Sequence, residues 1–278
     1  MNLWFSENAH GVLQMGLRVR RVIAEEQTPY QHIAILETDC FGRVLVLDNV
    51  VQLSERDHMG YHEMLTHIPM LVVDKPRRVL IVGGGDGGTL QQVLRYASVE
   101  EVVVCELDQR VVELSRRHLP FLGDPWSDSR VRLVIGDAFA YLQKNSELFD
   151  IILSDTPDPI GMAERLFSDE FYRLMVAALA PNGAAATQCE QMFLDTKLIQ
   201  RIYGTAKEWV KHPAYYYALV PSYPGGTIGF MYVSNLPWTN GMGKPYPPGE
   251  NRYLNPQVHR AAFALPEFFR RTIEESAT

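Results

Sequence analysis

Alternating apolar and polar residues predict that the chain begins with a small antiparallel β unit. The alternation runs through residues 17–23, 32–38 and 43–47, and turn-forming residues separate these runs. Side chains that alternate in this way point to opposite faces of a strand, one buried and one solvated. A helix through residues 61–65 follows. We therefore expect an N-terminal β domain over residues 1–70.

From residue 71 to 278 the pattern changes to strands that alternate with amphipathic helices. Short apolar runs predict strands at 78–82, 101–106, 131–135, 149–154 and 183–188. Such alternation predicts an α/β fold, a Rossmann-like, mostly parallel sheet with helices on both faces. Ligands of these sheets bind beyond the carboxyl ends of the strands. The polar motifs that follow the predicted strands are therefore candidates for a site.

Composition narrows the class of protein. The net charge is −7 and the pI is about 5.6, which disfavours a nucleic-acid partner, because such a partner would call for a basic face. The 3 cysteines show no metal-ligand spacing, which predicts neither a zinc site nor a disulfide framework. We see no membrane-spanning run and no signal peptide, and expect a soluble, cytoplasmic protein without a metal or cofactor.

A glycine-rich loop, Gly83-Gly84-Gly85-Asp86-Gly87-Gly88, separates the first strand of this domain from a helix expected at 89–94. Strand–turn–helix units ordinarily bind anions, because free N–H groups and the helix dipole point at the ligand. Asp86 would repel a pyrophosphate placed there and attract an amine or a sulfonium. The loop therefore predicts a nucleoside ligand with a cationic tail, and argues against NAD or a nucleotide phosphate.

Two more acids follow the next two predicted strands. Glu106 lies 21 residues after Gly85, close to the offset of ~20 residues at which an acid reaches ribose hydroxyls in nucleoside-binding folds. The competing interpretation is a strand-end acid that faces solvent. Gly136-Asp137 follows the third strand, where the carboxylate suits the adenine amine or, equally, caps the helix that begins at Ala138. Together with Asp86, these positions favour a nucleoside site.

A second group of polar residues suits an amine. Asp155 and Asp158 lie in a proline-containing loop after the strand 149–154, and close carboxylates raise one another's pKa, which helps one serve as a base. Tyr61 and Tyr223 offer aromatic faces and hydroxyls to an ammonium group. Glu190 follows the strand 183–188. Asp155 could instead shape a turn, and either tyrosine could simply pack at the surface.

The chain resembles the spermidine synthase (polyamine aminopropyltransferase) family nearly end to end. The resemblance rests on an ordered set of motifs: Leu3-Trp4-Phe5, Tyr30-Gln31, residues 41–48, residues 51–57, Tyr61-His62-Glu63-Met64, residues 83–88, residues 155–161, Pro221-Ser222-Tyr223-Pro224, Asn255-Pro256 and residues 261–266. The glycine loop alone is weak evidence, whereas the ordered set is specific. The resemblance also implies a sheet of the class I methyltransferase type.

The resemblance implies transfer of an aminopropyl group from decarboxylated S-adenosylmethionine, a co-substrate, to putrescine, which gives spermidine and methylthioadenosine. By resemblance, Asp155 deprotonates or orients the attacking amine, beside Tyr61 and Tyr223. The residues that would bind the donor are Gln31, Gln52, His62, Gly83, Gly85, Asp86, Glu106, Gly136 and Asp137, and those that would bind the amine are Asp158, Glu190, Tyr61 and Tyr223. Family members usually form homodimers or homotetramers, and we expect the same here, with the N-terminal unit in the subunit contact.

Some positions depart from the usual family pattern. Asn49 replaces a glycine, Pro157 replaces a serine or threonine, and Met162 replaces a frequent proline. These changes leave the reaction type intact and the acceptor open among putrescine, agmatine, cadaverine and spermidine. Two functions compete with aminopropyl transfer: that of an N-methyltransferase on the same scaffold, and that of a catalytically silent polyamine-binding protein.

Overall fold

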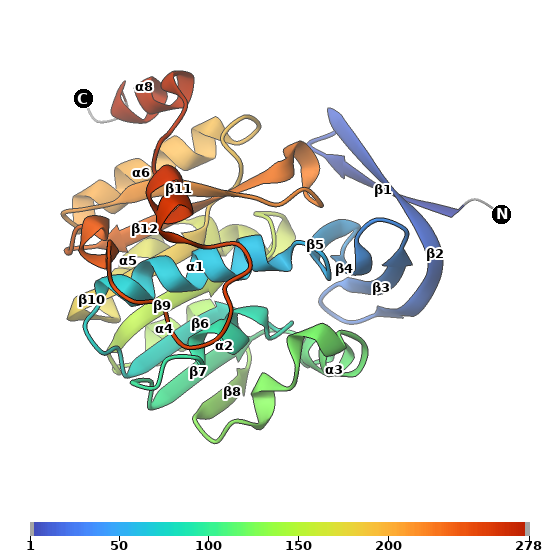
Figure 1. Cartoon of the computed structure of the whole chain (residues 1–278), viewed down its shortest axis with the longest axis horizontal. Coiled ribbons are helices and arrows are strands. Elements are labelled where there is room, and N and C mark those ends of the chain that lie inside the picture. The colour runs from blue at the N-terminus through green and yellow to red at the C-terminus, as the bar shows by residue number, and fades with distance from the viewer. Residues whose placement is uncertain (1–2, 276–278) are drawn as a thin grey trace.

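The computed structural model describes residues 3–275 and contains two sheets (Figure 1). The N-terminal sheet has the order β1-β2-β3-β4-β5, with every neighbouring pair antiparallel. Its strands are β1 (Leu3–Ala9), β2 (Leu13–Gln27), β3 (His32–Thr38), β4 (Gly42–Leu47) and β5 (Val50–Ser54). At the turn between β4 and β5, Asn49 has a φ of 65°, a left-handed conformation that asparagine tolerates well.

The second sheet has seven strands in the order β11-β12-β10-β9-β6-β7-β8. They are β6 (Arg78–Gly83), β7 (Glu101–Glu106), β8 (Val131–Ile135), β9 (Phe149–Asp155), β10 (Leu179–Gln188), β11 (Ala214–Leu219) and β12 (Thr227–Ser234). The pairs from β10 through β8 are parallel, whereas β12 is antiparallel to both of its neighbours. The strand order reverses between β6 and β9, which is where a parallel sheet binds ligands.

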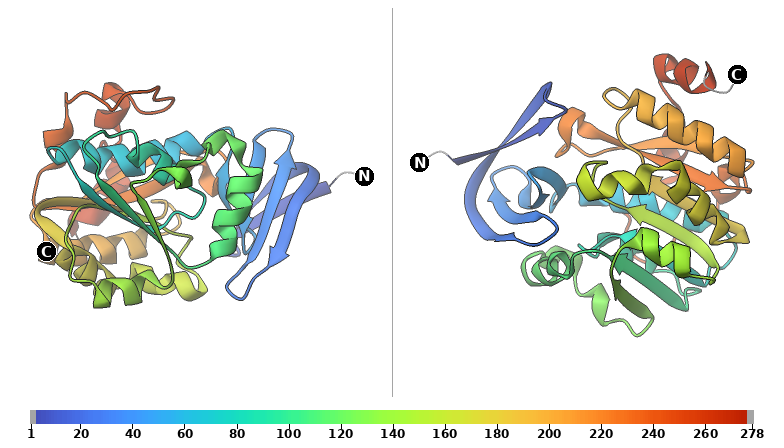
Figure 2. Two further views of the ribbon diagram at one scale, coloured as in Figure 1. Left: turned by 90° about the horizontal axis from the view of Figure 1, so that it is seen from below. Right: turned by 180° about the vertical axis from the view of Figure 1, so that it is seen from behind.

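Helices cover both faces of the second sheet (Figure 2). They are α1 (His58–Val72), α2 (Gly88–Val93), α3 (Gln109–His118), α4 (Ala138–Lys144), α5 (Asp169–Ala177), α6 (Thr196–Trp209), α7 (Pro256–Ala261) and α8 (Glu267–Glu275). Side chains of α1, α2 and α7 pack on one face, and those of α4, α5, α6 and α8 pack on the other. α3 instead packs against the N-terminal sheet.

The alternation of side chains along each strand explains the two-sided core. Val79 and Ile81 of β6 pack under α1, whereas Leu80 and Val82 pack under α4 and α5. All four are fully buried, so the centre of the strand, residues 79–82, is a continuous apolar run, as is typical of parallel strands covered on both faces. The predicted fold, an antiparallel β unit followed by a mostly parallel α/β sheet, is confirmed.

The sequence patterns missed several elements. β1 and β5 of the first sheet and β11 and β12 of the second were not among the predicted strands. Within residues 3–275, no helix is both long and apolar enough to cross a bilayer. The division of the chain at residues 70 and 71 remains a prediction.

Helix α1 joins the two sheets, and its buried Glu63 fixes the segment that covers it. Both carboxylate oxygens of Glu63 accept hydrogen bonds, at 2.8 Å from the backbone N–H of Arg252, 3.1 Å from that of Tyr253 and 2.7 Å from that of Leu254. An ionised acceptor strengthens such bonds. The C-terminal strap formed by residues 251–254 is thus held on α1 beside the site residues Tyr61 and His62.

We predict that Glu63→Ala lowers the free energy of unfolding by about 3–5 kcal/mol, because three backbone N–H donors, that of Leu254 buried and the other two part-buried, lose their acceptor. Urea denaturation monitored by circular dichroism measures the change. Glu100→Ala is the matched control, because that exposed glutamate pairs with Arg77 at the surface and should change stability by less than about 1 kcal/mol. Equal effects of the two substitutions would contradict this role for Glu63.

Candidate active site

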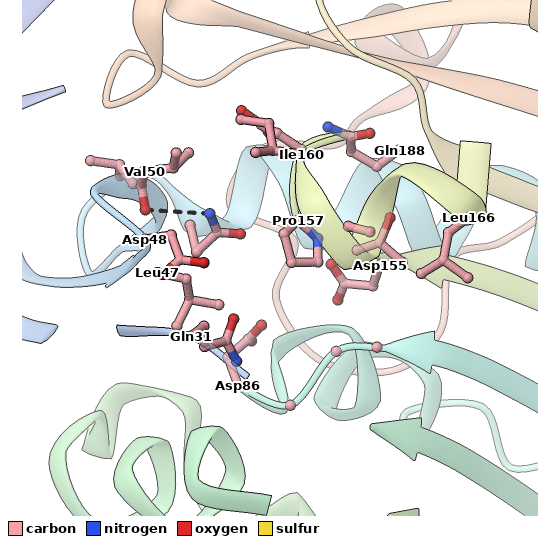
Figure 3. A pocket seen from close by; sticks show the side chains of 18 of the residues that line it. Gln31, Leu47, Asp48, Val50, Asp86, Asp155, Pro157, Ile160, Leu166 and Gln188 are labelled. Atoms are coloured by element: carbon pink, nitrogen blue, oxygen red, sulfur yellow. Dashed lines mark hydrogen bonds between the residues drawn. The ribbon is translucent and has the colours of Figure 1, made fainter. Parts of the chain in front are cut away.

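A cavity of about 270 Å³ opens at the carboxyl ends of β6 and β9, and residues of both domains line it. Every residue that the sequence assigns to the site lines this cavity: Gln31, Gln52, Tyr61, His62, Gly83, Gly85, Asp86, Glu106, Gly136, Asp137, Asp155, Asp158, Glu190 and Tyr223. Figure 3 shows the side chains of Asp86, Asp155 and Gln188 entering it from three different elements.

The glycine loop brings backbone and acids unusually close together. Gly83 has a φ of 75°, and a Cβ there would lie 2.2 Å from the carbonyl oxygen of Asp155. A Cβ on Gly85 would lie 2.8 Å from a carboxylate oxygen of Glu106. Position 83 therefore requires glycine, and a side chain at position 85 would have to displace the carboxylate of Glu106. The loop thus packs closely against the carboxyl ends of β9 and β7.

Asp86 occupies the anion-binding position of its own loop. The Gly88 N–H donates to Asp86 Oδ1 at 2.7 Å, and His62 Nε2 lies 3.4 Å from the same oxygen. Burial favours the neutral form of Asp86, but His62 and the Gly88 N–H outweigh burial and lower its pKa. The helix N-terminus already holds a carboxylate. This explains physically why the loop does not suit a phosphate.

Asp155 lies at the end of β9 and accepts a hydrogen bond of 2.6 Å from Thr89 Oγ1. Burial, followed by the negative charge of Asp86, raises its pKa to about 6. Side-chain atoms of His62, Asp86 and Asp155 lie within 4.8 Å of one another. The three groups are thus close enough to surround one ammonium group.

Tyr61 and Tyr223 line the same cavity as these acids. Their ring centroids are 6.3 Å apart in an edge-on arrangement. The Tyr223 hydroxyl donates to the backbone carbonyl of Gln52 and so connects the two domains. Burial and then Asp155 raise the pKa of both phenols well above its ordinary value. Both tyrosines are therefore neutral hydroxyl groups at physiological pH.

Glu106 faces the cavity and is buried, so the solvent-facing interpretation is wrong. Its carboxylate accepts from the backbone N–H of Gly85 at 3.0 Å and of Asp108 at 2.9 Å. Burial raises its pKa to about 7. Asp137 caps α4 by accepting from the Phe139 N–H at 2.9 Å, which confirms the capping interpretation. Its side chain nevertheless lines the cavity.

Gln31 and Gln52 reach the cavity from the N-terminal sheet. Gln31 Nε2 donates to Asp108 Oδ2 at 3.1 Å, beside Glu106. Gln52 Nε2 donates to the carbonyl of Val50 at 3.3 Å (Figure 3). The N-terminal domain thus contributes polar groups directly to the cavity wall.

A second acid cluster, which we define as Glu7, Asp158, Glu190 and Asp195, lines another part of the cavity. Burial and then Asp195 raise the pKa of Asp158 to about 6, while burial and then Asp158 raise that of Glu190 well above its usual range. Burial raises the pKa of Glu7 to about 7. The basic neighbour of these carboxylates is His10, whose Nε2 lies 3.0 Å from Asp195 Oδ1.

Glu190 is held in a strained backbone conformation. Its φ is 49°, which is uncommon for a residue other than glycine. The Tyr215 hydroxyl donates to its carbonyl at 2.9 Å and the Gly229 N–H does so at 2.8 Å. Gln188 Nε2 donates to its carboxylate at 2.8 Å. These bonds hold the side chain in the cavity at the end of β10.

Sequence reasoning missed three members of this region: Glu7, His10 and Asp195. Glu7 offered a signal, because in the alternating segment at residues 3–7 it falls on the same face as Leu3 and Phe5; the structure buries it, with only 3% exposed. A glutamate on the apolar face of an alternating strand marks either a partner or a site. His10 and Asp195 offered none, since only the folded chain brings the turn after β1 to the loop before α6 (Thr196–Trp209).

Comparison with known proteins identifies the family. A model described as "Spermine/spermidine synthase domain" matches residues 58–241, and one described as "Spermidine synthase tetramerisation domain" matches residues 3–55. The chain belongs to the spermidine synthase family of polyamine aminopropyltransferases. The resemblance and the enzyme class predicted from the sequence are thereby confirmed.

Individual members of the spermidine synthase family match along nearly the whole chain. A polyamine aminopropyltransferase of Thermoanaerobacter sp. (strain X514) is 40% identical over 286 residues, 99% of this chain and 100% of the relative. A spermidine synthase of Dictyostelium discoideum is 40% identical over 272 residues, 96% of each. The crystal structure of a spermidine synthase in complex with the transition-state analogue AdoDATO superposes with a TM-score of 0.94 at 32% identity, covering 98% of this chain and 95% of that one.

We predict that Asp158→Asn stabilises the free protein at pH 8. The folded state raises the pKa of Asp158 to about 6, so folding favours the protonated carboxyl, and the stability that this provides is lost as pH rises through about 6. Asparagine is neutral at every pH, so the gain is up to about 3 kcal/mol at pH 8 and disappears near pH 4. Thermal unfolding at both pH values measures it. Asp74→Asn, at an exposed position, is the control; a gain independent of pH would contradict the assignment.

Proposed function

We propose that this aminopropyltransferase is a spermidine synthase, which transfers the aminopropyl group of decarboxylated S-adenosylmethionine to putrescine. The observation that carries the proposal is the charge of the cavity. Among the described residues that line it, nine side chains are carboxylates, namely Glu7, Asp48, Asp86, Glu106, Asp137, Asp155, Asp158, Glu190 and Asp195, against one arginine, Arg165, and two histidines. A site so negative selects cations, and both substrates are cationic.

The donor fits the part of the cavity around the glycine loop. Glu106 would accept from the ribose hydroxyls, Asp137 from the adenine amine, and Gly83, Gly85 and Gly136 would let the nucleoside approach the backbone. Asp86, with His62, would hold the aminopropyl ammonium, and Gln31 and Gln52 would contact the tail and the nucleoside region. An intact methionine carboxylate would be repelled by Asp86, which favours the decarboxylated donor over the ordinary methyl donor.

The acceptor fits between Asp155 and the second acid cluster. Asp158 and Glu190 would bind one ammonium of putrescine, while the other end lies beside Asp155, Tyr61 and Tyr223. An alkylammonium has a pKa of about 10.4 and is not nucleophilic until it loses a proton. Asp155 accepts that proton, and the free nitrogen attacks the aminopropyl carbon attached to sulfur. The carbon–sulfur bond breaks, and its electron pair leaves with neutral methylthioadenosine.

Release of methylthioadenosine from decarboxylated S-adenosylmethionine tests the proposal, with putrescine, cadaverine, agmatine and spermidine offered separately. We expect the highest kcat/KM with putrescine. A higher kcat/KM with another amine would identify that amine as the acceptor and leave aminopropyl transfer as the reaction. If no methylthioadenosine were released with any of the four amines, the proposal would be overturned, and methyl transfer or polyamine binding without catalysis would be favoured instead.

We predict that Asp155→Asn lowers kcat by at least about 100-fold, the lower end of what a general base contributes, and leaves the Kd of the donor within a few-fold. The amide cannot accept the acceptor's proton but preserves shape. Single-turnover kinetics and donor titration separate the two effects. An equal loss of donor binding and turnover would assign Asp155 to donor binding or structure, and Tyr141→Phe, at a ring away from the cavity lining, serves as the control.

We also propose that the chain forms a homodimer or homotetramer through its N-terminal sheet. β1 and β2 carry exposed apolar side chains, with Trp4 58% and Val22 44% accessible, and exposed apolar patches mark interfaces. The match to a tetramerisation domain over residues 3–55 supports this. We predict that light scattering at micromolar concentration gives the mass of a dimer or tetramer, and that Trp4→Glu reduces it. A monomeric mass for the unmodified chain would contradict the proposal.

A further inference from the structure

Two buried histidines face each other on α1 (His58–Val72). His58 Nδ1 and His62 Nδ1 are 3.1 Å apart, and the rings lie one helical turn from each other. A neutral imidazole nitrogen without a proton only accepts hydrogen bonds, so two such nitrogens at this distance require one proton between them. The pair therefore consists of one donor and one acceptor.

The surrounding charges decide which ring donates. His62 Nε2 lies 3.4 Å from Asp86 Oδ1, and Asp155 and Glu63 also act on this ring. Burial opposes its charge, but these carboxylates outweigh burial and raise the pKa of His62. Around His58 the strongest influences are burial and the charge of His62, followed by Asp86 and Arg252, and its pKa falls to about 3. His58 is thus the acceptor for Nδ1–H of His62. The Asp86 carboxylate can only accept, so Nε2 of His62 also carries a proton, and His62 is the charged donor of the pair.

His62 has little room to move aside. A Cβ on Gly88 would lie 2.1 Å from Cε1 of His62, so the ring lies directly against the backbone of α2. Its other side faces Tyr61, with ring centroids 5.5 Å apart. The cation site bounded by His62, Asp86 and Asp155 has its ligand atoms within 4.8 Å of one another. An ammonium group that enters this site therefore approaches the charged ring of His62, which packing holds in place.

We propose that binding of the donor's ammonium group expels the Nε2 proton of His62, and that His58 directs this loss by keeping the Nδ1 proton in place. The neutral ring then points the lone pair of Nε2 at the entering ammonium and accepts a hydrogen bond from it. One proton leaves to solvent as one cationic group enters, so the number of positive charges between Asp86 and Asp155 stays constant. The inference rests on the proposed function, because it takes the ammonium group to be that of decarboxylated S-adenosylmethionine.

Calorimetric titration in two buffers of different ionisation enthalpy measures the protons released on binding. With decarboxylated S-adenosylmethionine we expect release that approaches one proton per site at pH values below the pKa of His62 and declines above it. Methylthioadenosine, which shares the nucleoside but lacks the ammonium, should release fewer than about 0.2. The affinity for the donor should rise by up to tenfold per pH unit while His62 is charged in the free protein, and level off above its pKa.

Two substitutions test the part played by His58. Asn offers a carbonyl oxygen to the Nδ1–H of His62, whereas Phe keeps a ring beside Phe121, which lies 5.1 Å from His58, but offers no acceptor. We expect His58→Asn to leave the dependence of proton release on pH unchanged. His58→Phe should shift that dependence to lower pH by about one unit, because the charged His62 loses a hydrogen bond. Unchanged affinity for methylthioadenosine verifies that each variant is folded.

The outcomes separate this inference from the proposed function. Donor that binds and is turned over without proton release at any pH from 6.5 to 8.5 would overturn the inference alone. A His58→Phe profile identical to that of the unmodified protein would overturn the role of His58. Failure of the donor to bind would overturn the inference together with the proposed function.

Discussion

Buried negative charge without matching positive charge is the constraint on which this molecule depends. Removing a carboxylate from water is costly unless hydrogen bonds or a cation compensate. The fold supplies part of that compensation from backbone N–H groups, as at Glu106 and Asp86. The remainder appears as raised pKa values at Asp155, Asp158 and Glu190. These acids therefore make the free protein less stable than neutral side chains would. A cationic ligand that binds only the folded state would raise the free energy of unfolding again.

Helix α1 (His58–Val72) helps to position that charge, because its own residues Tyr61 and His62 line the cavity and its neighbouring acids hold two further segments in place. Its first residue lies four positions after β5 (Val50–Ser54), and its body packs on the second sheet. Just before it, Asp57 accepts from both the N–H and the hydroxyl of Ser222, which fixes the loop that carries Tyr223. Glu63 fixes the C-terminal strap on the other side. A change in the angle of this helix would displace Tyr61, His62 and Tyr223 together.

The sequence predicted those features that depend on local pattern and failed where tertiary pairing decides. The centre of a parallel strand such as β6 is a continuous apolar run, and Asp86 is conspicuous in a glycine loop whatever surrounds it, so the sequence alone predicted both. β12 (Thr227–Ser234) is also largely apolar, but no motif marked it, and its antiparallel pairing follows no local rule. Glu7 reaches the cavity because β1 crosses toward β5, where Val51 N–H donates to it at 2.8 Å. No spacing along the chain contains that information.

The acids at the two ends of the cavity differ in which groups compensate their negative charge. At Asp86 the compensation is internal and rigid: a backbone N–H and the packed ring of His62. At the second acid cluster the polar contacts are spread over separate elements: Val51 N–H donates to Glu7, Gln188 donates to Glu190, and the exposed His10 lies 3.0 Å from Asp195. The Asp86 end is therefore rigid, while burial leaves Asp158 and Glu190 of the second acid cluster with raised pKa values. Under the proposed function, a diamine acceptor would gain most where compensation is weakest, which would locate acceptor specificity at the contact between the N-terminal sheet and the loop before α6.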